Sequence, residues 1–182
     1  MADIKTSFLI CLFATLLPFG QPQFTTYQQI CQRTTNSNLC IQIIDASTSS
    51  RLKANVNGWL QILSDQAKRI SLFTLTKIDD AGKNNPSPRL SRSLDECRVE
   101  YNEIIRGLEQ LEWRNLNRGN YADFNKALGY DELSVSACTN DFSQDPPIQS
   151  PVIIYTQSTK DVLDLTLEVL NLNQCNKITA CI

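Results

Sequence analysis

Residues 88–111, PRLSRSLDECRVEYNEIIRGLEQL, carry the pattern that decides the fold. Apolar side chains recur there at steps of three and four, at Leu90, Leu94, Cys97, Tyr101, Ile104, Leu108 and Leu111. This spacing places them on one face of an α-helix of about six turns. Cys97 lies on that face, so it is well placed for a disulfide to a neighbouring helix.

Three further segments show the same helical period, at about 51–77, 121–142 and 152–172. Ser49 and Ser50 are available as N-caps of the first of these. The segments between the helices, at 79–88, 115–120 and 143–151, are short and rich in turn-forming residues. Helices joined by short loops pack antiparallel, so the sequence predicts an all-α protein with an up-down-up-down four-helix bundle. The side chains expected to point inward include Trp59, Leu63, Ala67, Phe73, Phe124, Leu128, Val135, Cys138, Phe142, Val162, Leu165 and Val169.

Residues 27–46 form a shorter, two-part element ahead of the bundle. A polar break at 34–38 (TTNSN) separates two apolar pieces, which predicts a small helical hairpin. A bridge between Cys31 and Cys40 would pin the two arms together.

The first residues predict secretion. Lys5 precedes an apolar run at 8–19, which is shorter than the ~20 residues that a membrane span needs. We therefore expect residues 1–23 to be a secretory signal peptide, with a membrane anchor as the alternative. The bundle domain then covers 24–172, and 173–182 forms a C-terminal tail. Cleavage removes Cys11 and leaves six cysteines, which are Cys31, Cys40, Cys97, Cys138, Cys175 and Cys181. An even number in a secreted chain predicts disulfides, although six cysteines allow 15 pairings.

The composition argues against several classes of function. The 182 residues include 17 Lys and Arg, 19 Asp and Glu, and no histidine, for a net charge of −2. Without histidine there is no Ser-His or Cys-His nucleophile pair and no His-ligated metal. A chain without a basic excess is a poor nucleic-acid binder. The sequence thus predicts a binding protein that is not an enzyme and has no metal or cofactor.

Two kinds of residue are candidates for partner binding. Trp113 and Tyr121 lie beside the turn between the second and third bundle helices, where they either anchor an interface or cap the bundle. Asp131 falls on the otherwise apolar stripe of the third helix, where desolvation is expected to raise its pKa. A carboxyl that stays protonated in a complex would make affinity weaken from pH 5 to pH 7.

Four motifs in order along the chain resemble a known family. They are Ile30-Cys31-x-x-Thr34 with Leu39-Cys40, then Cys97-x-x-x-Tyr101 with Leu108, then Gly119-Asn120-Tyr121, and last Cys138-x-x-x-Phe142. Together they resemble the plant invertase and pectin methylesterase inhibitor family, and the likeness extends through Leu172. One stretch departs from the family, because Gly129-Tyr130-Asp131 replaces its usual Ser-Ala-Ala.

The resemblance implies a four-helix bundle with an N-terminal hairpin and the bridges Cys31–Cys40 and Cys97–Cys138. Cys175 and Cys181 are then left to pair with each other, unless one is free or intermolecular. It also implies a one-to-one complex of a monomer with a cell-wall or vacuolar enzyme, with Trp113, Asn120, Tyr121 and Asp131 as candidate contacts.

The resemblance leaves the target enzyme open between two candidates. Family members that block invertase insert a Pro-Lys-Phe turn, which is absent here, so pectin methylesterase in the cell wall or apoplast is the expected target. Invertase, in the wall or the vacuole, is the alternative. A secreted carrier of a small apolar ligand is the alternative from another class; it would need an apolar interior cavity.

Overall fold

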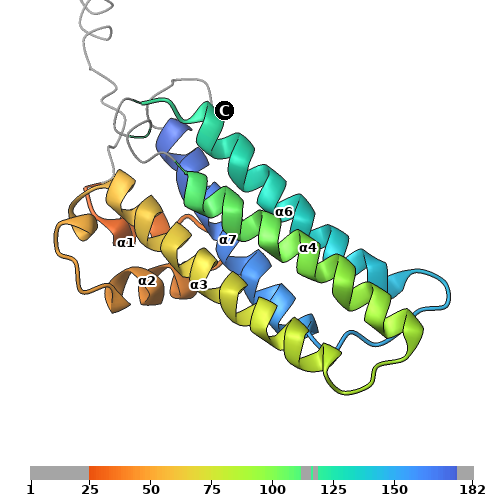
Figure 1. Ribbon diagram of the computed structural model, residues 1–182. Helices are drawn as coiled ribbons and strands as arrows, with labels where there is room; N and C mark the ends of the chain where they lie inside the picture. The colour runs from red at the N-terminus through yellow and green to blue at the C-terminus, as the bar shows by residue number, and fades with distance from the viewer. Residues whose placement is uncertain (1–24, 112–115, 117–118, 176–182) are drawn as a thin grey trace, which may run out of the picture.

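Four long helices form the body of the molecule (Figure 1). The computed structural model describes residues 25–111, 116 and 119–175, and it assigns no strand among them. The bundle helices are α3 (Val56–Gly82), α4 (Pro88–Gln110), α6 (Ala122–Ser143) and α7 (Ile153–Cys175). Each packs against its neighbours in the order α3, α4, α6, α7, and α7 closes the ring on α3. The predicted up-down-up-down bundle is therefore confirmed.

The predicted N-terminal hairpin consists of α1 (Tyr27–Cys31) and α2 (Ser37–Ala46). Thr26 caps α1 in a capping box, and Asn36 caps α2. The disulfide Cys31–Cys40 joins the two arms, as predicted. The Glu168 carboxylate of α7 accepts hydrogen bonds from Thr35, at 2.8 Å from the backbone N–H and 2.5 Å from Oγ1. These bonds fasten the hairpin to the bundle.

The predicted start of the first bundle helix was wrong by several residues. The Ser49 hydroxyl does accept from the Leu52 N–H at 3.4 Å, but it precedes the short 3-10 helix Leu52–Ala54, whose N-cap residue Arg51 makes no side-chain cap bond. Helix α3 begins at Val56 and is capped by Asn55. The 3-10 turn folds back on α3 at Gly58, where a Cβ would lie 2.0 Å from the Leu52 carbonyl oxygen. Glycine at this position therefore allows the turn to pack on the helix.

Helices α3 and α7 pack through small polar residues as well as apolar ones. Phe73 was expected to point inward, but it is 51% exposed and meets Tyr155 edge to face, with ring centroids 5.5 Å apart. The inward position belongs to Thr74, whose Oγ1 lies 3.3 Å from Thr159 Oγ1 of α7. Both hydroxyls also bond backbone carbonyls of their own helices, so each of these two buried hydroxyls has a partner. The spacing of apolar residues in the sequence could not predict that Thr74 takes the inward position instead of Phe73.

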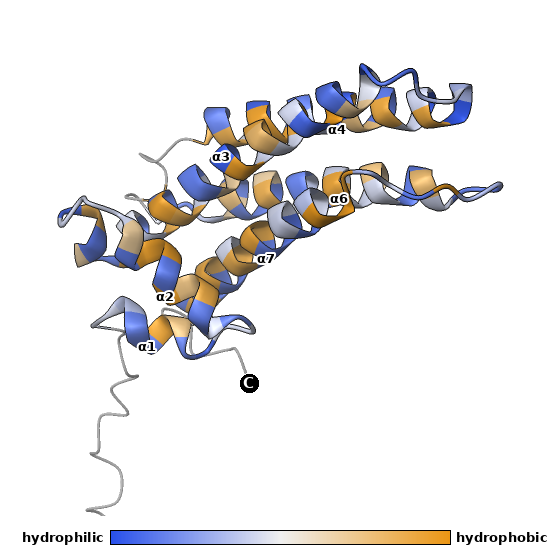
Figure 2. Cartoon of the chain, turned by 90° about the horizontal axis from the view of Figure 1, so that it is seen from below, coloured by the Kyte–Doolittle hydropathy of each residue, from blue (hydrophilic) through white to orange (hydrophobic). Residues whose placement is uncertain are grey.

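The core of the bundle is continuous from end to end. Trp59, Tyr101, Leu128 and Leu163 are each buried to 99% or more. Figure 2 shows hydrophobic and hydrophilic residues sharing each long helix, as expected when one stripe faces the core and the other faces solvent. Within the described residues no helix is both long and apolar enough to cross a bilayer.

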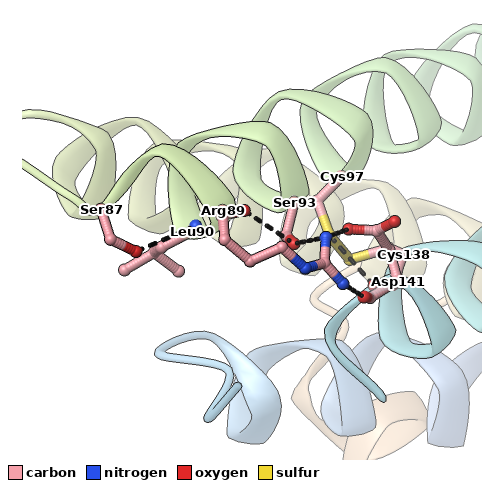
Figure 3. Close-up of polar contacts among 7 residues, drawn as sticks. All are labelled: Ser87, Arg89, Leu90, Ser93, Cys97, Cys138 and Asp141. Carbon is pink, nitrogen blue, oxygen red and sulfur yellow. Dashed lines mark hydrogen bonds and ion pairs between the residues drawn. A yellow bond between two sulfur atoms is a disulfide. The ribbon is translucent and has the colours of Figure 1, made fainter. Parts of the chain in front are cut away.

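A disulfide and a partly buried ion pair hold α4 against α6 (Figure 3). Cys97 and Cys138 are bonded, as predicted, with their Cα atoms 4.5 Å apart. Nearer the start of α4, the Arg89 guanidinium donates to the Asp141 carboxylate at 3.1 Å and to its backbone carbonyl, and also to Ser93 Oγ at 2.9 Å. The Arg89 and Asp141 side chains are mostly buried. These contacts fix the register of the two helices that form the candidate site.

Candidate functional site

An open groove runs between α4 and α6, with a volume of about 950 Å³. Its walls combine acidic and apolar side chains. The α4 wall includes Glu100, Glu103, Arg106, Gly107 and Leu111, and the α6 wall includes Asp123, Phe124, Ala127, Tyr130, Asp131 and Leu133. The groove lies on the surface of the bundle, so it differs from the enclosed apolar cavity that a lipid carrier needs.

The α4 wall carries most of the charge. Glu100, Glu103 and Arg106 follow each other at steps of three, so they line one edge of the helix. Arg106 Nη2 lies 2.7 Å from Glu103 Oε1, and both side chains are more than half exposed. The guanidinium is thus paired within its own helix. Acid therefore exceeds base along this wall.

The α6 wall exposes two large apolar side chains. Tyr130 is 59% exposed and Leu133 is 65% exposed. Lys126 Nζ lies 5.7 Å from the centre of the Tyr130 ring, so its charge sits over the aromatic face at the rim. Exposed aromatic and aliphatic residues surrounded by a polar rim are typical of protein–protein interfaces.

Neither Tyr130 nor Leu133 was predicted from the sequence as a contact residue. The available signal was that both lie off the stripe formed by Leu128 and Val135, so neither could serve the core. An aromatic residue outside the apolar stripe of an amphipathic helix is a candidate for contact with a partner.

Asp131 is buried against the backbone of the facing helix. The residue is 4% exposed, and Oδ2 has no hydrogen-bond partner among the described residues. A Cβ added to Gly107 would lie 2.5 Å from Asp131 Oδ1, so the carboxyl occupies the space that a side chain at position 107 would need. Burial raises the pKa of Asp131 to about 7. The pKa of Asp131 is thus raised, and desolvation is the cause, as the sequence led us to expect.

Two other predicted contact residues, Asn120 and Tyr121, directly precede α6, whose Asp123 and Phe124 line the groove. Tyr121 is only 7% exposed, so it caps the bundle as part of the core. Asn120 is exposed, and its side-chain amide donates to Asp123 Oδ2 at 3.2 Å. Trp113 lies outside the described residues. So does Cys181, and the predicted pair Cys175–Cys181 stays a prediction.

The described residues also contain no group of three or more His, Cys, Asp or Glu side chains that could hold a metal ion.

The known proteins that this chain resembles in sequence include inhibitors of enzymes. No family model matches it. It is 26% identical over 152 residues to a cell wall / vacuolar inhibitor of fructosidase 1 from Arabidopsis thaliana, covering 83% of this chain and 70% of the relative. It is 24% identical over 167 residues to a pectinesterase inhibitor from Actinidia deliciosa, covering 90% of this chain and 89% of the relative. These relatives are inhibitors of enzymes and not enzymes themselves.

Solved structures show the same fold. A mutant form of a pectin methylesterase inhibitor from Arabidopsis superposes with a TM-score of 0.65 at 20% identity, covering 81% of this chain and 97% of that one. A pectin methylesterase inhibitor from Arabidopsis thaliana gives a TM-score of 0.57 at 20% identity, covering 80% and 94%. The bundle with its hairpin is therefore shared over nearly the whole length of these proteins.

Proposed function

Because the matched relatives support the plant invertase and pectin methylesterase inhibitor family for this chain, we propose that it is a secreted inhibitor of pectin methylesterase. It acts as a monomer and forms a one-to-one complex that covers the pectin cleft of the enzyme. The observation that carries this proposal is the groove between α4 and α6, an acidic and partly apolar surface on a scaffold shared with pectin methylesterase inhibitors.

The charge of the groove favours pectin methylesterase over invertase. Hydrolysis of the methyl esters of pectin leaves carboxylates, so the cleft of that enzyme must accommodate an anionic polymer. Glu100, Glu103 and Asp123 offer negative charge to a cleft of this kind. Invertase acts on a neutral sugar, so its pocket does not need positive charge that the acidic groove could complement.

Invertase remains the second candidate, since one relative is named as an inhibitor of a fructosidase. Two features of the turn before α6 argue against it. The turn reads Gly119-Asn120-Tyr121 where invertase-blocking members of the family carry Pro-Lys-Phe. Tyr121 is also buried, so it is not available for insertion into a sugar pocket.

We further propose that residues 1–23 direct secretion to the cell wall and are then removed. The relative from Arabidopsis thaliana is named for the cell wall and the vacuole, which supports an extracellular or vacuolar site. No cofactor and no nucleic acid take part in this function.

The experiment is a pair of inhibition assays with the full chain secreted from a eukaryotic host. Purified protein is titrated against pectin methylesterase and against acid invertase at pH 5 to 7. We expect loss of pectin methylesterase activity and no effect on invertase. Inhibition of invertase alone would show that invertase, and not pectin methylesterase, is the target. Inhibition of neither, with tight uptake of a fluorescent lipid, would favour the carrier.

A further inference from the structure

The Asp131 carboxyl is an unsatisfied polar group inside the groove. Asp131 lines the groove but is only 4% exposed. Its Oδ2 atom lacks a hydrogen-bond partner within the described part of the chain. Buried polar side chains are nearly always bonded in native proteins, so an exception calls for an explanation. One explanation is that a partner supplies the missing donor.

Gly107 makes room for this carboxyl on the opposite helix. Any side chain at position 107 would meet Asp131 Oδ1, since even a Cβ would lie at 2.5 Å. Gly107 itself lines the groove. The Asp131 carboxyl therefore packs directly against the bare backbone of Gly107, and we call this contact on the groove wall the Asp131–Gly107 notch.

The charged groups of α4 facing the notch are predominantly acidic. Glu100 and Glu103 line the groove with Arg106, and Arg106 is paired with Glu103 at 2.7 Å. That pairing leaves α4 with net negative charge beside the notch.

The cations of α6 and α7 near Asp131 are engaged elsewhere. Lys126 lies over the Tyr130 ring at 5.7 Å. Lys160 of α7 contacts Glu132 at 3.3 Å and Asp164 at 2.8 Å. Asp123 adds a further carboxylate to the α6 wall. Among the side chains that line the groove, Glu100, Glu103 and Asp123 outnumber Arg106, and this excess of acid favours a cation.

We propose that Asp131, at the Asp131–Gly107 notch on the groove wall, is a specificity residue for a Lys or Arg side chain that the inhibited enzyme places in the groove. The cationic group donates to the carboxyl, and its apolar stem lies along the groove beside Tyr130 and Leu133. This inference rests on the proposed function, because it assumes the groove faces the enzyme.

A cation in the notch has a consequence for pH. In the free protein burial holds the pKa of Asp131 at about 7, so the carboxyl is mostly protonated at pH 5. An adjacent cation favours the carboxylate. Binding must then displace a proton at low pH, and affinity rises as the pH rises. If the bound carboxyl titrates below pH 5, the dissociation constant falls by up to about 50-fold between pH 5 and pH 7. A carboxyl that stays protonated in the complex would give the opposite slope.

The test measures the dissociation constant for pectin methylesterase at pH 5 and pH 7 with three full-length proteins. These are the wild type, Asp131→Asn and Glu132→Gln, the last a neighbouring acid that faces α7. For each protein, the dissociation constant at pH 5 is divided by that at pH 7. Dividing this ratio for each variant by the wild-type ratio cancels the contribution of groups that titrate on the enzyme. We expect Asp131→Asn to flatten the rise and to bind at least tenfold more weakly at pH 7, while Glu132→Gln matches the wild type.

An unchanged pH slope in Asp131→Asn, or a wild-type affinity that weakens toward pH 7 through Asp131, would overturn the inference while leaving inhibition intact. A wild type that does not bind the enzyme would overturn the proposed function as well. Calorimetry of the wild type in buffers of different ionisation enthalpy is a check that needs no variant. Roughly 0.8 proton should leave Asp131 on binding at pH 6, and net proton uptake would contradict the proposal.

Discussion

Substitution of Asp131 by Asn should stabilise the folded protein at neutral pH. The carboxyl has an ordinary pKa of 3.8 and a pKa of about 7 when buried. Between these values the folded state holds a proton that the unfolded chain has released, so stability falls as the pH rises. The slope approaches about 1.4 kcal/mol per pH unit, and the loss between pH 4 and pH 7 is roughly 3 kcal/mol. For a domain stable by about 5–15 kcal/mol this is a large effect.

Urea unfolding followed by circular dichroism at pH 4, 5, 6 and 7 measures this effect. The wild type should lose stability toward pH 7, and Asp131→Asn should remove most of that loss. Asp65, whose pKa burial also raises, and Asp80, whose pKa is lowered by a bond to Lys83, affect both proteins equally. Glu96→Gln, an exposed change on α4, serves as the control. Parallel pH profiles for the wild type and Asp131→Asn would refute the reasoning.

Three further changes test the contacts between α4 and α6. Replacing both Cys97 and Cys138 by Ser should lower the free energy of unfolding by about 4 kcal/mol, since the bridge closes a loop with a separation of 41 residues; urea unfolding measures this. Gly107→Ala should cost about 1–2 kcal/mol because its Cβ meets the Asp131 carboxyl, and a double-mutant cycle should show a smaller cost in an Asp131→Ala background. Arg89→Ala should cost about 2 kcal/mol by leaving the Asp141 carboxylate unpaired, which calorimetry would detect as a lower Tm.

Much of the fold could be predicted from the sequence because the bundle depends on helical period and short loops. The stripe through Leu94, Cys97 and Tyr101 is fully buried in the structure. The start of α3 could not be predicted in the same way. A serine at 49 and an asparagine at 55 are both good N-caps, and the choice between them depends on the packing of Leu52 on Gly58.

The candidate site could be predicted only in part. Asp131 was identifiable as an acid on an apolar stripe, and the structure buries it. That Gly107 lies opposite, and that Glu100 and Glu103 line the same groove, depends on the register between two helices. This register is fixed by contacts between residues distant in sequence, such as Arg89 with Asp141, which no local pattern encodes.

Hydrogen exchange of the protein with and without pectin methylesterase tests most directly whether the groove faces the enzyme. We expect backbone amides of α4 near Glu103 and of α6 near Tyr130 to become protected in the complex. The face of α3 and α7 that exposes Phe73 and Ile154 should exchange as in the free protein. Protection of the α3 and α7 face, with the groove amides unchanged, would contradict the account.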